Sequence, residues 1–170
     1  MHPHIIETKR LILRALTPDD AAAVFAWTSD PLVNRYMRYP LYTSEEQAYP
    51  WLSAVTDSPF DFGFVRKSDG LLIGSGGVVP DDDRLEWELG YNLRRDCWGQ
   101  GYATEAARAM LRFAYEVHGA RNFIACHVLE NTASGRVMEK CGFVYDHDET
   151  TSKFDGSQTF RTRCYTLRLD

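Results

Sequence analysis

The sequence lacks a long apolar run, an excess of basic residues and any closely spaced pair of cysteines. No stretch of its 170 residues approaches the roughly 20 apolar residues that cross a bilayer. We therefore expect no membrane as partner. Its formal net charge of -5 is unlike that of a nucleic-acid-binding protein, so we expect no nucleic acid as partner either. The opening MHPHIIETKR has no apolar core of a signal peptide, which predicts a cytoplasmic protein.

The chain has little cysteine, and the four it has lie far apart at Cys97, Cys126, Cys141 and Cys164. This spacing argues against a zinc site or a disulfide framework and fits a reducing compartment. Each cysteine is therefore expected to be a small buried side chain. The five histidines show no ligand spacing either, so we predict no metal.

The length and composition fit one globular domain over residues 1–170, with 44% hydrophobic and 25% charged residues. Strand and helix signals are mixed along this length, which predicts an α/β (α+β) domain with a mixed sheet. Strands are expected over 10–16, 60–67, 71–80, 84–93, 122–129, 143–153 and 158–170. Helices are expected over 17–27, 43–55 (with a kink or split at Pro50), 103–117 and 131–141, and a short helical turn within 29–40.

The stretch CWGQGYATEA, residues 97–106, places Gly99 and Gly101 between a predicted strand and a predicted helix. The first turn of a helix exposes unpaired N–H groups at its positive end, and glycines let an anion approach the backbone. A phosphate site and a plain turn both fit these residues. A P-loop is excluded because Gly-Lys-Ser/Thr is absent, and a dinucleotide-binding turn because Thr104 replaces the third glycine.

The flanking segments resemble the GNAT superfamily of acyl-CoA-dependent N-acyltransferases, in particular its ribosomal-protein N-terminal acetyltransferase (RimJ/RimL-like) branch. The resemblance covers most of the chain and is carried by ETKRLILRALTPDDAAAVFAW, EWELGYNLRRDCWGQGYATEAARAMLRFAY and ACHVLENTASGRVMEKCGF. It implies a single domain with a splayed, mostly antiparallel sheet of about seven strands flanked by helices. It also implies acetyl-CoA as cosubstrate, and a homodimer is an expectation from the family.

The resemblance assigns the binding of CoA to backbone groups around the two glycines and to the splayed strand. The pyrophosphate would lie at Arg94, Arg95, Gly99, Gln100, Gly101, Ala103 and Thr104. Asp96 departs from the family, many members of which have Gln or Arg three residues before the first glycine. The sheet would splay just past ELGYNL, so that pantetheine pairs with backbone near Asn92 and Leu93. Asn131 would hydrogen-bond the pantetheine and also cap the helix that follows it.

The resemblance further implies three catalytic groups for transfer to an amine. Glu88 occupies the position of a catalytic glutamate in several family members and would accept the amine proton, with Glu86 or a water as alternatives. The backbone N–H near Asn92 would stabilise the oxyanion. Met138 stands where many members have a tyrosine acid, so Ser134, on the same helix face, becomes the proton donor. The alternatives are exposed strand glutamates and a helix-entry serine that bonds backbone.

The acceptor is much less constrained by the sequence. By resemblance, residues 33–43 and the loop before the closing strands line the acceptor groove, where Tyr36, Met37 and Tyr39 would offer an apolar side. The acids at 81–83, Glu86 and Glu88 would attract a cationic amine. A protein N-terminal α-amino group is the first hypothesis, a small-molecule amine the second, and a non-catalytic acyl-CoA-binding module the third.

Overall fold

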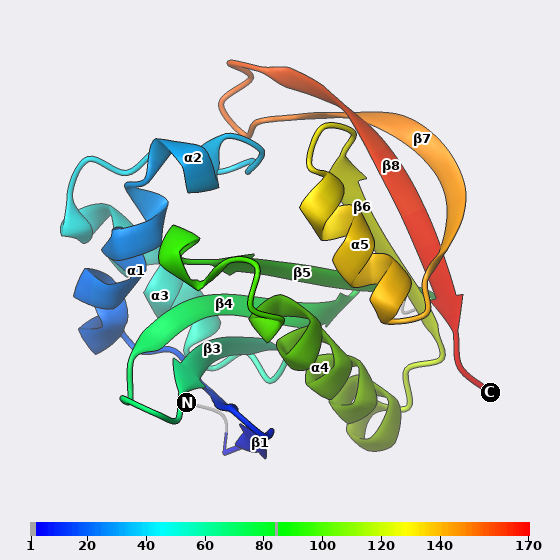
Figure 1. Cartoon of the computed structure of the whole chain (residues 1–170), viewed down its shortest axis with the longest axis horizontal. Coiled ribbons are helices and arrows are strands. Elements are labelled where there is room, and N and C mark those ends of the chain that lie inside the picture. Colours follow the sequence, from blue (N-terminus) through cyan, green and yellow to red (C-terminus); the bar gives the residue numbers. More distant parts are fainter. Residues whose placement is uncertain (1–2, 84) are drawn as a thin grey trace.

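One sheet forms the centre of the computed structural model, which describes residues 3–83 and 85–170 (Figure 1). Within these residues eight strands lie in the order β1-β2-β3-β4-β5-β6-β8-β7. The strands are β1 Ile6–Glu7, β2 Leu11–Arg14, β3 Asp61–Arg66, β4 Leu72–Pro80, β5 Trp87–Leu93, β6 Asn122–Val128, β7 Val144–Ser152 and β8 Thr159–Arg168. The mixed, mostly antiparallel α/β sheet confirms the predicted fold class. The strand beyond the seven predicted is β1, which pairs with β2 over two residues.

Helices cover both faces of this sheet. They are α1 Ala21–Thr28, α2 Pro31–Asn34, α3 Tyr49–Val55, α4 Tyr102–His118 and α5 Thr132–Lys140. Leu72 and Ile73 are neighbours on β4, so their side chains point to opposite faces. Leu72 packs in the cluster formed with α1 and α3, whereas Ile73 packs in the larger cluster that α4 covers. The sheet therefore has an α1/α3 face and an α4/α5 face.

The sheet opens between β5 and β6. These two strands are parallel and pair only at Trp87 with Phe123 and at Glu88 with Ile124, although β5 continues to Leu93. The other strand pairs of the sheet are antiparallel. The predicted splay is thus confirmed, but it begins at Leu89 rather than just past ELGYNL.

The strand β5 alternates as its sequence predicts, from Trp87 onward. Trp87 and Leu89 are buried, while Glu88 and Gly90 are exposed. Leu85 was expected on the buried face and is 69% exposed, because the strand starts two residues after it. The predicted start at Arg84 lies outside the described residues.

The helix α4 begins and ends at glycines with left-handed backbone, Gly101 (φ 82°) and Gly119 (φ 72°). Its predicted apolar face is buried at Ala106, Ala107, Met110 and Ala114. Val117, at its far end, is 51% exposed. Helical periodicity therefore placed the helix correctly and overextended its buried face by one turn.

The predicted helix over 43–55 is divided at its proline, as expected. A 3-10 turn, Glu45–Ala48, starts at Ser44 with a capping box to Gln47, and α3 then begins with Pro50 in its first turn. Proline is accepted there because the first helical N–H groups have no intrahelical partner.

The expectation that all four cysteines are separate buried side chains is wrong for two of them. Cys126 on β6 and Cys164 on β8 are cross-strand partners and are joined as a disulfide. Sequence spacing missed the pair because 38 residues separate its members. Cys97 is a buried free cysteine and Cys141 a partly buried one.

The entry to α1 depends on Asp20. Thr17 caps a 3-10 turn, Pro18–Asp20, and its N–H donates to Asp20 Oδ2 at 2.9 Å. Arg14 donates to both carboxylate oxygens, each at 2.9 Å. Burial alone would raise the pKa of Asp20, but the hydrogen bonds from Arg14 and Thr17 outweigh it and hold this pKa below its usual range.

The substitution Asp20→Asn is expected to lower the free energy of unfolding by about 1–2 kcal/mol at pH 7. A carboxyl whose pKa is lowered by folding stabilises the protein above its unfolded pKa, and this contribution disappears as pH falls through the folded value. The difference from wild type should therefore shrink toward about pH 3. Urea unfolding at both pH values measures it, with the exposed Asp19→Asn as control. An equal loss at both pH values would contradict the ionic role.

Candidate active site

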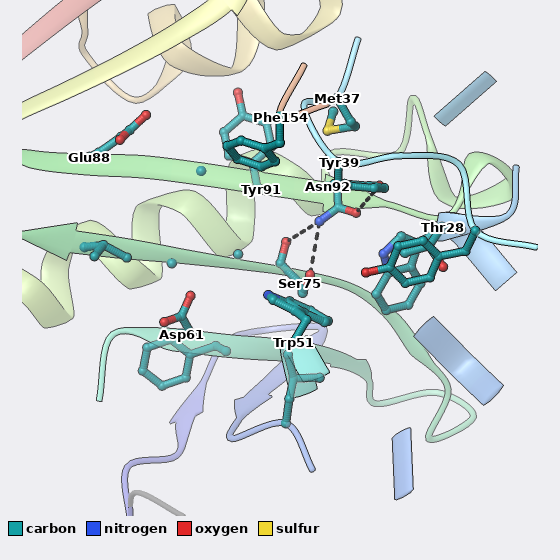
Figure 2. Close-up of a pocket in the computed structure, with 18 residues that line it drawn as sticks. Thr28, Met37, Tyr39, Trp51, Asp61, Ser75, Glu88, Tyr91, Asn92 and Phe154 are labelled. Atoms are coloured by element: carbon teal, nitrogen blue, oxygen red, sulfur yellow. Dashed lines mark hydrogen bonds between the residues drawn. The ribbon is translucent and has the colours of Figure 1, made fainter. Parts of the chain in front are cut away.

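A cavity of about 380 Å³ lies on the α1/α3 face where the sheet opens (Figure 2). Strands β3, β4 and β5 form its floor, and residues from 37–42, α1, α3 and the β7–β8 hairpin form its walls. Met37 and Tyr39 line it as predicted, whereas Tyr36 is absent from its lining and lies under Arg35. The cavity thus brings together segments that are far apart in the sequence.

The strand β5 presents different groups on its two faces at the opening. Glu88, Gly90 and Asn92 alternate with Leu89 and Tyr91. The first three line the cavity, and Tyr91 also contributes to its lining at the open edge. Glu88 is exposed, and Figure 2 shows its carboxylate toward one end of the cavity. Glu86 lies outside both β5 and the cavity lining, so of the two predicted carboxylates only Glu88 is placed at the cavity.

The side chain of Asn92 is held in place from two sides. Its Nδ2 donates to Ser75 Oγ at 3.0 Å and to the Ser75 carbonyl at 3.3 Å, and its Oδ1 accepts from the Tyr39 hydroxyl at 3.3 Å. These bonds link β5 to β4 and to the 37–42 segment (Figure 2). The amide side chain therefore supports the cavity wall.

The register of β4 and β5 shows which backbone groups face the open edge. The N–H of Arg94 donates to Ile73, and the N–H of Asp81 donates to Glu86. In an antiparallel pair such bonds recur at every second residue, so the even-numbered residues of β5 bond to β4. The backbone of Asn92 therefore faces β4, and that of Tyr91 and Leu93 faces the opening. The carbonyl of Leu93 accepts from the Trp98 indole at 3.1 Å.

The helix α5 approaches the opening from the other face and carries the predicted Asn131 and Ser134. Asn131 stands at the N-cap position, but its side chain makes no capping hydrogen bond. Ser134 Oγ lies 2.9 Å from the Tyr91 hydroxyl, which also donates to the Ser134 carbonyl at 3.0 Å. Met138 is buried one turn further along.

The hydroxyl of Tyr91 is a site feature that sequence reasoning missed. Burial raises the pKa of Tyr91 above its usual value, so the hydroxyl stays protonated at neutral pH. The alternation of β5 places Tyr91 on the face opposite Glu88, but only the fold shows that α5 crosses that face. No sequence spacing connects residues 91 and 134.

The glycine turn, residues 99–101, leaves the start of α4 accessible. Gly99 and Gly101 both have left-handed backbone, with φ of 70° and 82°, and the whole turn is exposed. No side chain caps the first turn of α4. Ala103 and Thr104 lie in that turn, partly buried and buried. The uncapped N–H groups and the helix dipole together favour an anion at this point.

Arg10, the residue before β2, holds this turn in place and was not predicted as part of the site. Its guanidinium donates to the Gln100 carbonyl at 2.8 Å and to Glu105 Oε2 at 2.7 Å. Glu105 also accepts from the Arg10 N–H and the Thr8 hydroxyl. The start of α4 is thereby tied to the loop between β1 and β2.

The two arginines predicted to bind CoA each have an acidic partner. Arg94 makes two hydrogen bonds to Asp96, which lower the pKa of that carboxyl, and Arg95 pairs with Asp30 at 2.9 Å. Asp96, the residue that departs from the family pattern, thus orients Arg94. The Gln100 side chain donates to the Asp96 carbonyl.

Potential metal ligands gather at one place within the described residues. Cys126, Glu149 and Cys164 have ligand atoms within 4.8 Å of one another, and two of these atoms are the disulfide sulfurs.

Among the described helices, none is both long and apolar enough to cross a bilayer.

Comparisons with known proteins identify the family of this chain. The model of the acetyltransferase (GNAT) domain family matches residues 10–144. The FsC-acetyl coenzyme A-N(2)-transacetylase of Aspergillus fumigatus is 30% identical over 165 residues, covering 88% of this chain and 68% of that protein.

Two solved structures share the fold. A GNAT-family acetyltransferase from Bacillus anthracis has a TM-score of 0.87 at 24% identity, covering 97% of this chain and 98% of that one. The ribosomal-protein-S5-alanine acetyltransferase of Vibrio fischeri has a TM-score of 0.77 at 15% identity, covering 98% and 97%. With a family match over most of its length, the chain belongs to the GNAT acetyltransferases and is an acetyl-CoA-dependent N-acetyltransferase.

Proposed function

We propose that the protein transfers the acetyl group of acetyl-CoA to a primary amine by direct attack in a ternary complex. The observation that carries this proposal is the opening beside β5, with Glu88 on one face and the Ser134–Tyr91 pair on the other. A thioester in the opening would have a carboxylate on the amine side and hydroxyl groups on the sulfur side. This is the arrangement that acyl transfer to an amine requires.

The donor is held mainly by backbone groups. The CoA pyrophosphate lies at the glycine turn and the first N–H groups of α4, with Arg94 and Arg95 at its edge. The pantetheine arm lies along the open edge of β5, where Leu93 and Tyr91 offer backbone groups, and Asn131 hydrogen-bonds it from α5. The Asn131 side chain makes no capping hydrogen bond to α5, which supports this role.

The amine loses its proton to Glu88, directly or through a water, and its nitrogen attacks the thioester carbon. The oxyanion accepts a hydrogen bond from the open edge of β5. We assign this donor to the N–H of Tyr91, the neighbour of Asn92, because Asn92 faces β4 in this register. The carbon–sulfur bond then breaks, and Ser134 gives its proton to the departing thiolate.

Tyr91 acts through Ser134 as a positioning residue. Its hydroxyl fixes the Ser134 Oγ at 2.9 Å and, being protonated, can turn its one proton from the Ser134 carbonyl to that oxygen as the serine loses its own proton. The buried Met138 offers no acid at the position where many family members have tyrosine.

The acceptor we propose first is the α-amino group of a protein N-terminus, as in the RimJ/RimL-like branch. The fold shared with the Vibrio fischeri ribosomal-protein acetyltransferase supports this assignment. A small-molecule amine is the second candidate, supported by the limited volume of the cavity and by the FsC transacetylase relative. A cytoplasmic site of action and a homodimer remain proposals of the same kind.

The substitution Gly101→Val is expected to raise the Kd for acetyl-CoA by at least about tenfold. A valine there crowds the anion-binding turn, and its Cβ would lie 3.3 Å from the Arg10 guanidinium. The matched control is Gly119→Val at the other end of α4, which has the same left-handed strain and nothing within 4 Å. Calorimetric titration of both variants tests the role. Equal weakening by both would show that the strain alone is responsible.

The substitution Ser134→Ala is expected to lower kcat by about tenfold or more, because the thiolate loses its proton donor. Tyr91→Phe should cause a smaller fall and should add little in the Ser134→Ala background, since it acts through Ser134. The Kd for acetyl-CoA should stay near the wild-type value in both. Unchanged kcat at saturating acetyl-CoA in Ser134→Ala would rule out the serine as acid.

The overall proposal predicts thiol release from acetyl-CoA with a panel of peptides and primary amines. Glu88→Gln should lower kcat by about a hundredfold at neutral pH, whereas the control Glu86→Gln, outside the cavity, should have little effect. Acetylated peptides identified by mass spectrometry would support the first candidate. Tight acetyl-CoA binding without thiol release for any acceptor would instead support a non-catalytic acyl-CoA-binding module.

A further inference from the structure

The cavity beside β5 has an acidic floor and aromatic walls. Asp61 and Glu88 supply carboxylates, and no Lys, Arg or His is found among the described residues that line it. Trp51, Tyr42 and Phe154 remain partly or largely exposed. Trp27 and Phe62, by contrast, are 1% exposed and belong to the cores. The rings of Trp51, Tyr42 and Phe154 therefore keep accessible surface at the cavity that is not used in packing the cores.

The floor is bare where the acceptor nitrogen would lie. Gly77 and Gly90 are cross-strand partners, and Asp61 pairs with Gly77 on its other side. A Cβ at Gly77 would lie 3.0 Å from Asp61 Oδ1, so this carboxylate stands over the floor. A Cβ at Gly90 would meet nothing within 4 Å, and Gly90 is not among the positive-φ glycines. The backbone conformation at position 90 does not require glycine, and the absence of a side chain there leaves free space between Glu88 and Asn92.

The aromatic wall begins a short distance from this point. Asn92 is two residues beyond Gly90, which is about 7 Å along a strand. The Tyr39 hydroxyl bonds Asn92, and the Tyr39 and Tyr42 rings are in contact at 6.0 Å between centroids. Figure 2 shows Trp51 between Asp61 and Thr28 and Tyr39 beside Asn92, both away from Glu88. An amine over Gly90 would reach this wall through two or three carbon atoms.

The β7–β8 hairpin closes the cavity from above. Lys153 Nζ donates to the Asn34 carbonyl and side chain and to the Met37 carbonyl at 2.8 Å. The Phe154 N–H donates to the Arg38 carbonyl, and the Arg38 guanidinium lies 4.5 Å from the Phe154 ring centre. The exposed Phe154 is thereby held at the cavity, which favours a flat, compact group over a long chain.

We infer that the acceptor is a primary amine with an aromatic ring two or three carbon atoms from the nitrogen. The carboxylates of Asp61 and Glu88 attract its ammonium form, and the ring lies against Trp51, Tyr42 and Phe154. A free arylalkylamine and a polypeptide with an aromatic first residue share this chemistry. The inference rests on the proposed acetyl transfer, since it names what that reaction accepts.

Steady-state kinetics at saturating acetyl-CoA tests the inference with two matched pairs of acceptors. Phenethylamine is compared with n-butylamine, and a peptide that begins with Phe is compared with the same peptide beginning with Ala. The aromatic member of at least one pair should have a kcat/KM higher by about tenfold or more, as burial of a ring predicts. Which pair responds distinguishes the free amine from the polypeptide. Equal values within both pairs, or a preference for the aliphatic members, would overturn the inference and leave the proposed function intact.

Variants locate the effect in the cavity. Phe154→Ala should lower kcat/KM for the aromatic acceptor by a larger factor than for n-butylamine, so that the ratio of the two values falls toward one. Tyr145→Ala is the matched control, because Tyr145 is also an exposed ring beneath an arginine but lies outside the cavity lining. An equal response of both variants would argue against a ring site.

A binding measurement separates the two levels of the proposal. Phenethylamine is titrated into the CoA complex by calorimetry, with n-butylamine as reference. If no acceptor yields thiol but phenethylamine binds more tightly, and Phe154→Ala removes the difference, the aromatic site stands and the acetyl transfer fails. If phenethylamine binds no better than n-butylamine, the aromatic site fails whatever the thiol assay gives.

Discussion

The short pairing between β5 and β6 is the constraint on which the rest of the site depends. Two residue pairs join these strands, whereas β5 pairs with β4 over seven and β6 with β8 over seven. Each strand is therefore secured on its outer side and can leave its neighbour without losing its place in the sheet. The cost is a row of backbone groups at Tyr91 and Leu93 without a strand partner. The Leu93 carbonyl accepts from the Trp98 indole instead, and a ligand with amides of its own, lying in the opening, would satisfy the others.

This opening also gives β5 two chemically different faces. Because side chains alternate along a strand, Glu88 and Asn92 turn toward the cavity, while the Tyr91 hydroxyl reaches Ser134 on α5. In the proposed mechanism, one strand thus contributes both the carboxylate for the amine and the hydroxyl that fixes Ser134. Separation by the strand itself keeps the proton acceptor away from the proton donor. The two proton transfers are therefore assigned to opposite faces of the same thioester.

The fold class could be predicted from the sequence, and the glycine turn located, because both depend on local patterns. Period-two and helical spacing located seven of the eight strands, and Gly99 and Gly101 marked the turn before α4. The missed features are either very short or long-range. The strand β1 is only two residues long, whereas Tyr91 meets Ser134 of α5 across the opening and Cys126 meets Cys164 on the neighbouring strand. Leu85 followed the right alternation but fell outside the strand, since periodicity does not show where pairing stops. The position of the splay was missed for the same reason.

The contrast between local patterns and long-range contacts also applies to the two halves of the proposed site, the donor site and the acceptor cavity. In the proposed mode of binding, the donor contacts backbone groups and a helix start, which many sequences can supply, so a short motif is enough to suggest the site. The acceptor cavity takes residues from α1, the 37–42 segment, α3, three strands and the β7–β8 hairpin. Its character is set by which side chains those distant segments contribute. The carboxylates lie near Gly90, and the aromatic wall starts at Tyr39, which bonds Asn92 about 7 Å further along the strand. Under the inferred preference, selection therefore depends on the separation of ring and nitrogen as well as on charge.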